Sequence, residues 1–233
     1  MSTDYRVRFS KNGPIKYTGH LDVMRYFQKA IVRSELPVAY SEGFSPHQIL
    51  SFAFPLSVGF TSDGEYFDFR MTEEVNEEDV LNRLEKQMID GINVISVKKL
   101  PENSENCMSS VFAAKYRIRI KDRVELPDDY IEKYNDYFGQ FTIPVNKPKK
   151  KGGGFIEIDL KQFVYDYTII NKDLYLTVNA SSSDNIRPDF LIKCYFDYMG
   201  IELPEFAYNV HRLDIYANKG SEDEIVLVSL GEA

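Results

Sequence analysis

The polar residues best suited to chemistry in this sequence are spread among aromatic residues between positions 20 and 60. His20 stands at the expected start of a helix, where the positive end of the helix dipole lowers the pKa of an imidazole and favours a neutral base. Donors and acceptors beside aromatic side chains recur in segment 40–60, which is punctuated by glycine and proline and is typical of a pocket rim. We expect one concave site formed by these residues: His20, Ser41, Glu42, Phe44 and His47. The alternatives are a structured crossover and a histidine that only caps or packs.

A row of cations follows His20 in the same predicted helix. Arg25, Lys29 and Arg33 recur at every fourth position, which places them on one face and lets them follow the phosphates of a nucleic acid. Arg6 and Arg8, in the preceding strand, could add to this basic surface. The alternative is a helix face that is charged because it is solvated.

A second basic segment lies in the other half of the chain. Lys147, Lys149, Lys150 and Lys151 are followed by the glycines of 152–154, which predicts a mobile cationic hairpin with exposed backbone N–H groups. Such a segment can bind phosphates without sequence preference and with strong salt dependence. A solvated loop tip is the alternative.

Composition and missing motifs exclude several functional classes. The net charge over 233 residues is −8, yet residues 1–60 have seven Lys/Arg and four Asp/Glu, so a basic surface can persist locally. Cys107 and Cys194 are not in a metal-binding or iron–sulfur spacing, which favours a reducing cytosol. No phosphate-binding loop, dinucleotide fingerprint or zinc-protease motif occurs, and no long apolar run predicts a membrane span. We therefore expect a soluble cytoplasmic protein with no cofactor, metal or membrane of its own.

Hydrophobic periodicity predicts an α+β fold made of two tandem ferredoxin-like units. In the first half the order β-α-β-β-α-β is indicated by strands at 5–10, 37–40, 65–71 and 92–100 and by helices starting near 18 and at 77–88. In the second half we expect strands at 111–120, 141–145, 155–160, 174–180 and 210–217, helices at 128–138 and 187–199, and an edge strand within 225–230. The second unit includes the basic hairpin as an insertion. The predicted domains are 1–103 and 110–233, separated by a polar loop.

Several motifs resemble those of the radical-SAM-linked bacterial protein family, a domain of unknown function. The resemblance rests on GHLD and MR in the first helix, LPVAYSEGF, SFAFP, GEYFD, and later KKKGGGFIEIDL, IRPDFLIKCYFDYMG and VHRLDIYA. It covers nearly the whole chain, and its first part is the most specific. Where the family has an arginine before ISFA, this sequence has Gln48-Ile49-Leu50, which weakens a role for a cation there.

The resemblance implies partners rather than an activity. Proteins of this family are fused to radical SAM proteins or encoded beside them, often near genes for RNA-processing and ribosomal proteins. This favours an accessory protein that presents RNA, or an RNA–protein substrate, to a radical SAM partner. One alternative is a metal-independent RNA-processing enzyme that uses His20, by analogy with the two-unit endonucleases of CRISPR systems, and another is a protein-interaction adaptor. The residues in 40–60 and the lysines of 147–151 are the sites to test.

Overall fold

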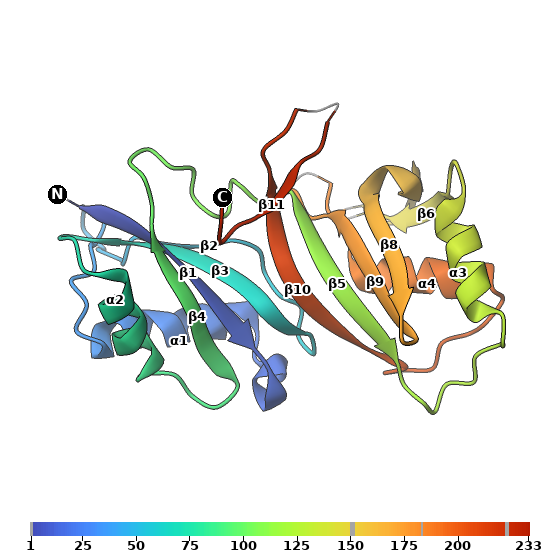
Figure 1. Ribbon diagram of the computed structural model, residues 1–233, viewed down its shortest axis with the longest axis horizontal. Helices are drawn as coiled ribbons and strands as arrows, with labels where there is room; N and C mark the ends of the chain where they lie inside the picture. The colour runs from blue at the N-terminus through green and yellow to red at the C-terminus, as the bar shows by residue number, and fades with distance from the viewer. Residues whose placement is uncertain (1, 150–151, 183, 222–223) are drawn as a thin grey trace. The chain divides into compact units, whose positions relative to one another are not determined.

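The computed structural model describes residues 2–149, 152–182, 184–221 and 224–233. The chain forms two compact units (Figure 1), unit 1 with Met1–Ala113 and His211–Ala233, and unit 2 with Ala114–Val210. The division after Ala113 lies close to the polar loop expected at 101–110. Residues 211–233, in contrast, group with the first unit. That residues 1–103 and 110–233 are independent domains stays a prediction.

Unit 1 contains a mainly antiparallel sheet with strand order β4-β1-β3-β10, in which β2 also pairs with β3 and β11 with β10. The β3–β10 pairing is parallel and short, joining Thr61 to His211 and Ser62 to Arg212. The elements are β1 (Thr3–Lys11), η1 (Gly13–Tyr17), α1 (His20–Arg33), β2 (Leu50–Phe52), β3 (Thr61–Met71), α2 (Glu77–Glu85), β4 (Ile92–Lys99), β10 (Tyr208–Asn218) and β11 (Leu227–Ser229). The order β-α-β-β-α-β expected before residue 101 is present.

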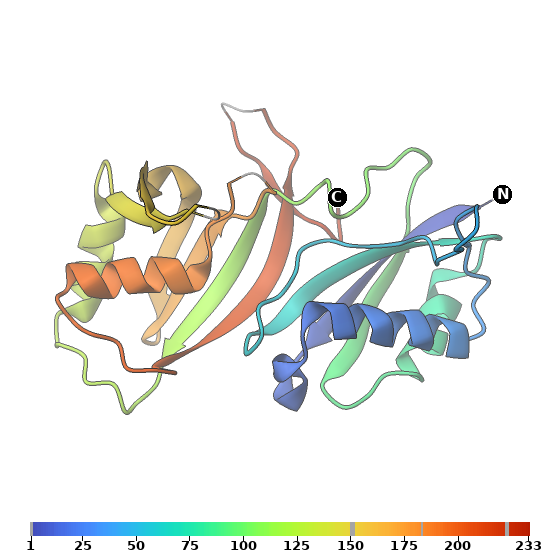
Figure 2. The same cartoon turned by 180° about the vertical axis from the view of Figure 1, so that it is seen from behind.

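Both helices of unit 1 pack on the same face of this sheet. Alternate residues of β1 (Tyr5, Val7, Phe9) enter one core cluster with Phe27 of α1 and Leu84 of α2, because strand alternation and helical spacing each direct one face inward. Figure 2 shows α1 lying along the strands. The opposite face of α1 is exposed, so its cations are in solvent.

The start of α1 differs from the prediction by two residues. Thr18, near which the helix was expected to start, is the extended residue after the short 3₁₀ helix η1, and Gly19 is the N-cap. The helix therefore begins at His20 itself. The first turn contains the acidic residue Asp22, whose negative charge interacts favourably with the positive end of the helix dipole.

The segment after α1 contains less regular structure than expected. The predicted strand at 37–40 is reduced to two isolated bridges, Val38 with Met71 and Tyr40 with Gln48. The strand that pairs with β3 is instead β2, whose Ser51 lies opposite Asp68.

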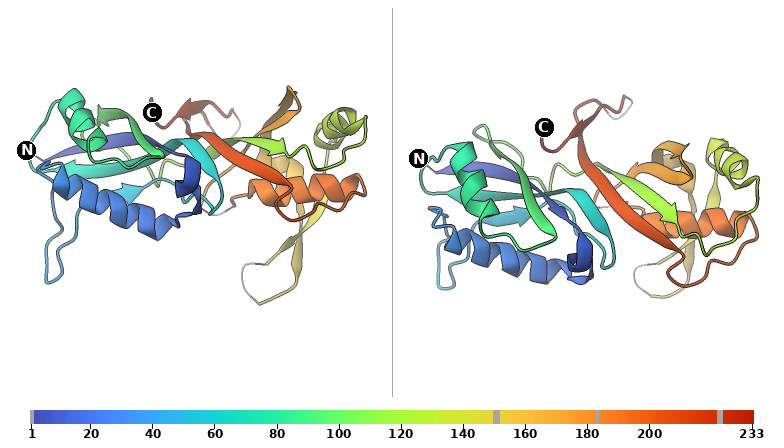
Figure 3. Two further views of the ribbon diagram at one scale, coloured as in Figure 1. Left: turned by 90° about the horizontal axis from the view of Figure 1, so that it is seen from below. Right: turned by 60° about the horizontal axis from the view of Figure 1, so that its bottom comes forward.

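Unit 2 contributes three neighbouring sheet strands in the order β5-β9-β8, and it contains a separate two-stranded hairpin, β6–β7. Its helices meet in an aromatic core where Tyr134 of α3 and Tyr195 of α4 pack edge to face at 5.3 Å. The elements are β5 (Ala113–Ile120), α3 (Tyr130–Gly139), β6 (Pro144–Pro148), β7 (Phe155–Asp159), η2 (Leu160–Phe163), β8 (Val164–Ile170), β9 (Asp173–Asn179) and α4 (Pro188–Tyr198). Figure 3 shows the hairpin extending away from α4.

The fold class is mixed α+β with mostly antiparallel strands. Strand β8 was not predicted. It forms a hairpin with β9 through Asn171 and Lys172, whose φ angles of 50° and 69° are those of a two-residue turn. The tandem ferredoxin-like arrangement stays a prediction.

Candidate functional site

Three charged residues are buried together at the end of unit 1 where α1 begins. Lys11, Glu65 and Arg212 have exposed fractions of only 2%, 6% and 2%. Fully buried charges are rare in proteins unless they are paired. We call these three residues the buried charge cluster; none of them was among the predicted site residues.

The alternation of two strands delivers two members of the cluster to the core side of the sheet. Lys11 continues the inward series Tyr5, Val7 and Phe9 of β1. Glu65 lies opposite Phe9 in the neighbouring strand β3, so its side chain is on the same face. The sequence alone could have indicated both residues, because each is a charged residue in a series of apolar residues at every second position of its strand.

Arg212 connects the cluster to the segment that follows β2. Its Nη1 donates to both carboxylate oxygens of Glu65, at 2.9 and 3.0 Å, and to the carbonyl of Phe54 at 3.1 Å. Its Nη2 donates to the carbonyl of Pro55 at 3.1 Å, and its guanidinium lies 4.8 Å from the ring centroid of Phe54. Burial raises the pKa of Glu65, and Arg212 opposes that rise. The ion pair thus fixes residues 54–55 against β3.

Lys11 holds the turn that leads into α1. Its Nζ donates to the carbonyl of Thr18 at 2.7 Å and to that of Lys16 at 3.5 Å. Burial lowers the pKa of Lys11; Glu65 opposes this effect and Arg212 adds to it. The two carbonyl groups that accept from Lys11 carry no net charge. The carboxylate of Glu65 is therefore the group that compensates the buried ammonium.

His20 borders the cluster and is only half buried. Its ring packs edge to face on Phe52 with 5.7 Å between the centroids. Burial lowers the pKa of His20, and the charges of Lys11 and Arg212 lower it further. The imidazole is therefore neutral at pH 7, and the cluster contains two cations and one carboxylate. An excess of positive charge at the N-terminus of a 14-residue helix suits an anionic group.

Two of the other predicted residues meet in a different place. The Ser41 hydroxyl lies 2.8 Å from His47 Nδ1, and the His47 backbone N–H donates to the same hydroxyl at 3.1 Å. These bonds close the loop 41–47, on which Glu42 and Phe44 are exposed to solvent. A shallow groove of about 520 Å³ runs beside this loop and is lined by Gln28, Lys29, Val32, Arg33, His47 and Gln48.

The single concave site expected for His20 and this loop is not what the structure shows. No hydrogen bond, ion pair or ring contact among the described residues joins His20 to Ser41, Glu42 or His47. The groove beside His47 begins at Gln28, eight residues along α1 from His20, or about 12 Å at 1.5 Å per residue. The two histidines serve separate surfaces.

The cation row (Arg25, Lys29 and Arg33) is exposed along α1, as the spacing predicts. Arg25 Nη1 is 3.4 Å from Asp22, and Arg33 Nε donates to Gln87 at 3.4 Å. Lys29 makes no ion pair within the described part of the chain. Weak partners of this kind leave the row available to a polyanion.

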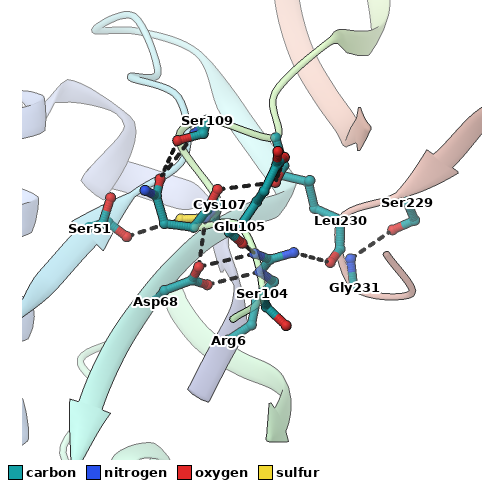
Figure 4. Close-up of polar contacts among 12 residues, drawn as sticks. Arg6, Ser51, Asp68, Ser104, Glu105, Cys107, Ser109, Ser229, Leu230 and Gly231 are labelled. Carbon is teal, nitrogen blue, oxygen red and sulfur yellow. Dashed lines mark hydrogen bonds and ion pairs between the residues drawn. The ribbon is translucent and has the colours of Figure 1, made fainter. Parts of the chain in front are cut away.

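Arg6 is not part of this surface, contrary to expectation. It is buried and forms a bidentate pair with Asp68, at 2.8 and 3.0 Å (Figure 4). It also donates to the carbonyls of Leu230 and Glu105, at 3.1 and 3.0 Å, while Asp68 accepts from the backbone of Cys107 at 2.6 Å. This arginine joins β1, β3, the segment after β4 and the C-terminal residues, so its role is structural.

The hairpin lysines are in different environments. Lys147 is half buried, and its Nζ donates to the carbonyl of Asn185 at 3.0 Å, so it anchors the hairpin. Lys149 is exposed, and its backbone N–H donates to the carbonyl of Gly154 at 3.1 Å. Lys150 and Lys151 lie outside the described residues.

Within the described ranges, no group of three or more His, Cys, Asp or Glu side chains is placed to hold a metal ion. In the same ranges, no helix has the length and apolar character needed to span a bilayer.

Comparison with known protein families identifies one family. Residues 4–188 match the model of the uncharacterized protein conserved in bacteria (DUF2344). The chain belongs to this family. The matched range contains every predicted site residue, together with Lys11 and Glu65, whereas Arg212 lies beyond it.

Comparison with curated proteins gives no match. Among solved structures, a chain of the crystal structure of a Cbf5-Nop10-Gar1 complex is similar, with 12% identity and a TM-score of 0.45. The match covers 91% of this chain and 48% of the other, so this chain spans about half the length of that one. Similarity at this level carries no conclusion about function.

Proposed function

We propose that this DUF2344 protein is an RNA-binding subunit without independent catalytic activity, which presents RNA to a radical SAM partner in the cytoplasm. The observation that carries the proposal is the cation row, exposed on α1 and weakly paired. Its members are about 6 Å apart along the helix axis, since each is four residues from the next. A linear set of cations at this spacing favours a polyanionic chain over a compact anion.

The buried charge cluster supports the same proposal at the N-terminal end of α1. Its excess positive charge and the helix dipole favour one phosphate beside His20. The neutral imidazole of His20 offers a hydrogen bond to that phosphate. Among the described residues, the neighbours of His20 are the Phe52 ring and the cations Lys11 and Arg212 rather than a nucleophile and an orienting carboxylate, which favours binding over catalysis.

The radical SAM partner and the tandem ferredoxin-like fold complete the proposal. The partner is inferred from the resemblance to the radical-SAM-linked bacterial family, which rests on motifs such as GHLD, SFAFP and GEYFD. The fold is inferred from the β-α-β-β-α-β order in unit 1 and from a second unit that also pairs strands with two helices.

The test is a salt titration of single-stranded RNA binding by fluorescence anisotropy. The triple variant Arg25→Gln, Lys29→Gln, Arg33→Gln should lower the slope of log K against log salt by about two, at about 0.7 per phosphate contact. A matched control removes three exposed lysines elsewhere in unit 1: Lys86→Gln, Lys98→Gln and Lys219→Gln. The control should retain the wild-type slope within about 0.5.

Two further readouts separate the alternatives. Equal slopes in wild type, row variant and control would remove the cation row from the proposal. Cleavage of the RNA in the presence of a chelator, lost in His20→Ala, would identify an RNA-processing enzyme instead. A third outcome is that this protein binds a radical SAM protein, but binds RNA neither by itself nor in that complex. This outcome would identify a protein-interaction adaptor.

A further inference from the structure

The β6–β7 hairpin of unit 2 has one edge blocked by proline and one edge open. Its register pairs Pro144 with Asp159, Asn146 with Glu157, and Pro148 with Phe155. No other strand of the described residues pairs with either β6 or β7. The hairpin therefore has two outer edges.

The hydrogen bonds at its two ends define which groups point outward. The Lys149 N–H donates to Gly154 at one end and the Leu160 N–H to Ile143 at the other. Because hydrogen-bonded pairs alternate with non-bonded pairs in an antiparallel ladder, the three pairs that contain residues 144, 146 and 148 are non-bonded. Their backbone groups point away from the partner strand.

The two edges differ as a result. On β6, two of the three outward positions are proline and have no N–H to donate. On β7, Phe155, Glu157 and Asp159 each direct an N–H and a carbonyl outward, and no described residue pairs with them there. An unprotected edge is a template for a further strand, whereas proline prevents one.

The side chains of β7 make this edge apolar at one end and acidic at the other. Phe155 is 65% exposed and shares its face with Glu157, two residues on. Ile156, on the other face, is 51% exposed. Asp159 extends the acidic end, although its side chain also accepts from the N–H groups of Ile143 and Lys161.

We propose that the outer edge of β7 binds an extended segment of a partner protein by strand addition, with an apolar residue opposite Phe155 and a basic residue opposite Glu157. A second copy of β7 is disfavoured as the occupant, because antiparallel pairing about its centre places Glu157 against Glu157. A basic alternating segment offers the complementary charge, while the main chain supplies the affinity. This site shares no residue with the RNA surface proposed for α1.

The test uses the full chain and two synthetic extended peptides as probes. The basic peptide alternates lysine or arginine with valine and ends in phenylalanine. The acidic peptide has the same sequence with glutamate at every basic position. Titration by anisotropy, with amide hydrogen exchange by NMR, should show binding of the basic peptide and slower exchange at Phe155 and Glu157. The acidic peptide should bind at least about tenfold more weakly, since like charges directly opposite are destabilising.

A matched pair of proline variants tests the edge itself. Glu157→Pro removes one outward N–H from β7, and Asn146→Pro removes the N–H of its cross-strand partner from the opposite edge. Neither substitution removes a bond between β6 and β7. Glu157→Pro should weaken the basic peptide by at least about tenfold and Asn146→Pro should not, because only the first change removes a donor from the proposed edge.

Charge reversal gives a second test that leaves every backbone group in place. Glu157→Arg should reverse the preference, so that the acidic peptide binds more tightly than the basic one. Equal affinities of wild type and Glu157→Pro would overturn the proposal. So would protection at residues outside 155–159, a dimer formed through β7, or no binding of the basic peptide by a wild type that still binds RNA.

Discussion

The guanidinium of Arg212 contacts both carboxylate oxygens of Glu65 through a single nitrogen, at 2.9 and 3.0 Å, in a site almost closed to solvent. Removal of one member of such a pair leaves the other charge buried and uncompensated. The pair therefore organises unit 1, because it also holds the carbonyls of Phe54 and Pro55.

Arg212→Ala should lower the free energy of unfolding by about 3–5 kcal/mol, because it leaves the Glu65 carboxylate unpaired in the core. The measurement is urea denaturation followed by circular dichroism. The matched control is Arg187→Ala, which removes an exposed pair with Asp189 and should cost less than about 1 kcal/mol. A loss of similar size in both variants would show that the buried pair has no special role.

The pKa of His20 should lie below its ordinary value of 6.5, because burial and the charges of Lys11 and Arg212 disfavour the imidazolium. A folded-state pKa below the unfolded one means that the unfolded chain takes up the proton first as the pH falls. The contribution of His20 to stability is then fully present above pH 6.5 and is lost through the window just below it. NMR titration of the ring protons measures the pKa directly. In His20→Gln the decline in stability over that window should be shallower, and the same change at the exposed His47 is the control; an unchanged slope would contradict the prediction.

Gly64 should not accept a side chain. A Cβ at this position would lie 2.6 Å from the Asp214 Cα and 2.7 Å from the Leu213 carbonyl oxygen, both backbone atoms of β10 that cannot rotate away. Gly64→Ala should therefore destabilise the protein by about 1–3 kcal/mol in urea denaturation. Gly139→Ala, in the last turn of α3, is the control, since a Cβ there would lie 3.5 Å from the Tyr167 hydroxyl, an ordinary van der Waals distance. Equal stabilities of the two variants would show that β3 and β10 separate easily.

The two thiols should differ in reactivity towards an alkylating reagent. Burial raises the pKa of Cys107 far above its ordinary value and raises that of the partly exposed Cys194 to about 11. Since the thiolate is the nucleophile, Cys194 should be labelled first and Cys107 only on opening of the fold. Asp68→Ala should accelerate labelling of Cys107, because Asp68 accepts its backbone N–H. Peptide mass spectrometry separates the two sites, and fast labelling of Cys107 in the wild type would contradict its burial.

Periodicity predicted most elements of the fold, because a side chain's burial depends on its spacing along the element. The alternation of Tyr5, Val7 and Phe9 gave β1, and the helical spacing of Phe27 and Ile31 gave the buried face of α1. Strand β8 was missed, since its turn is Asn171-Lys172 and contains no glycine. A full strand was predicted at 37–40, where the structure has only isolated bridges, because a local pattern does not show whether a partner strand lies in register beside it.

The candidate site was only partly predictable from the sequence. His20 and the cation row follow from local spacing, whereas the buried charge cluster needs a strand that returns from far along the chain. Lys11 and Glu65 interrupt apolar phases, and that was a usable signal. No spacing indicated that Arg212 would complete them, because 147 positions separate it from Glu65.

The return of β10 to unit 1 has a consequence for the order in which the protein is made. During translation, residues 1–113 emerge first with the Glu65 carboxylate present and its guanidinium partner not yet synthesised. The whole of unit 2 must be translated before Arg212 leaves the ribosome. The nascent first unit therefore stays incomplete, with a charged residue in its core, until β10 has been synthesised, and chains interrupted before residue 212 should be recognised as unfolded by proteases.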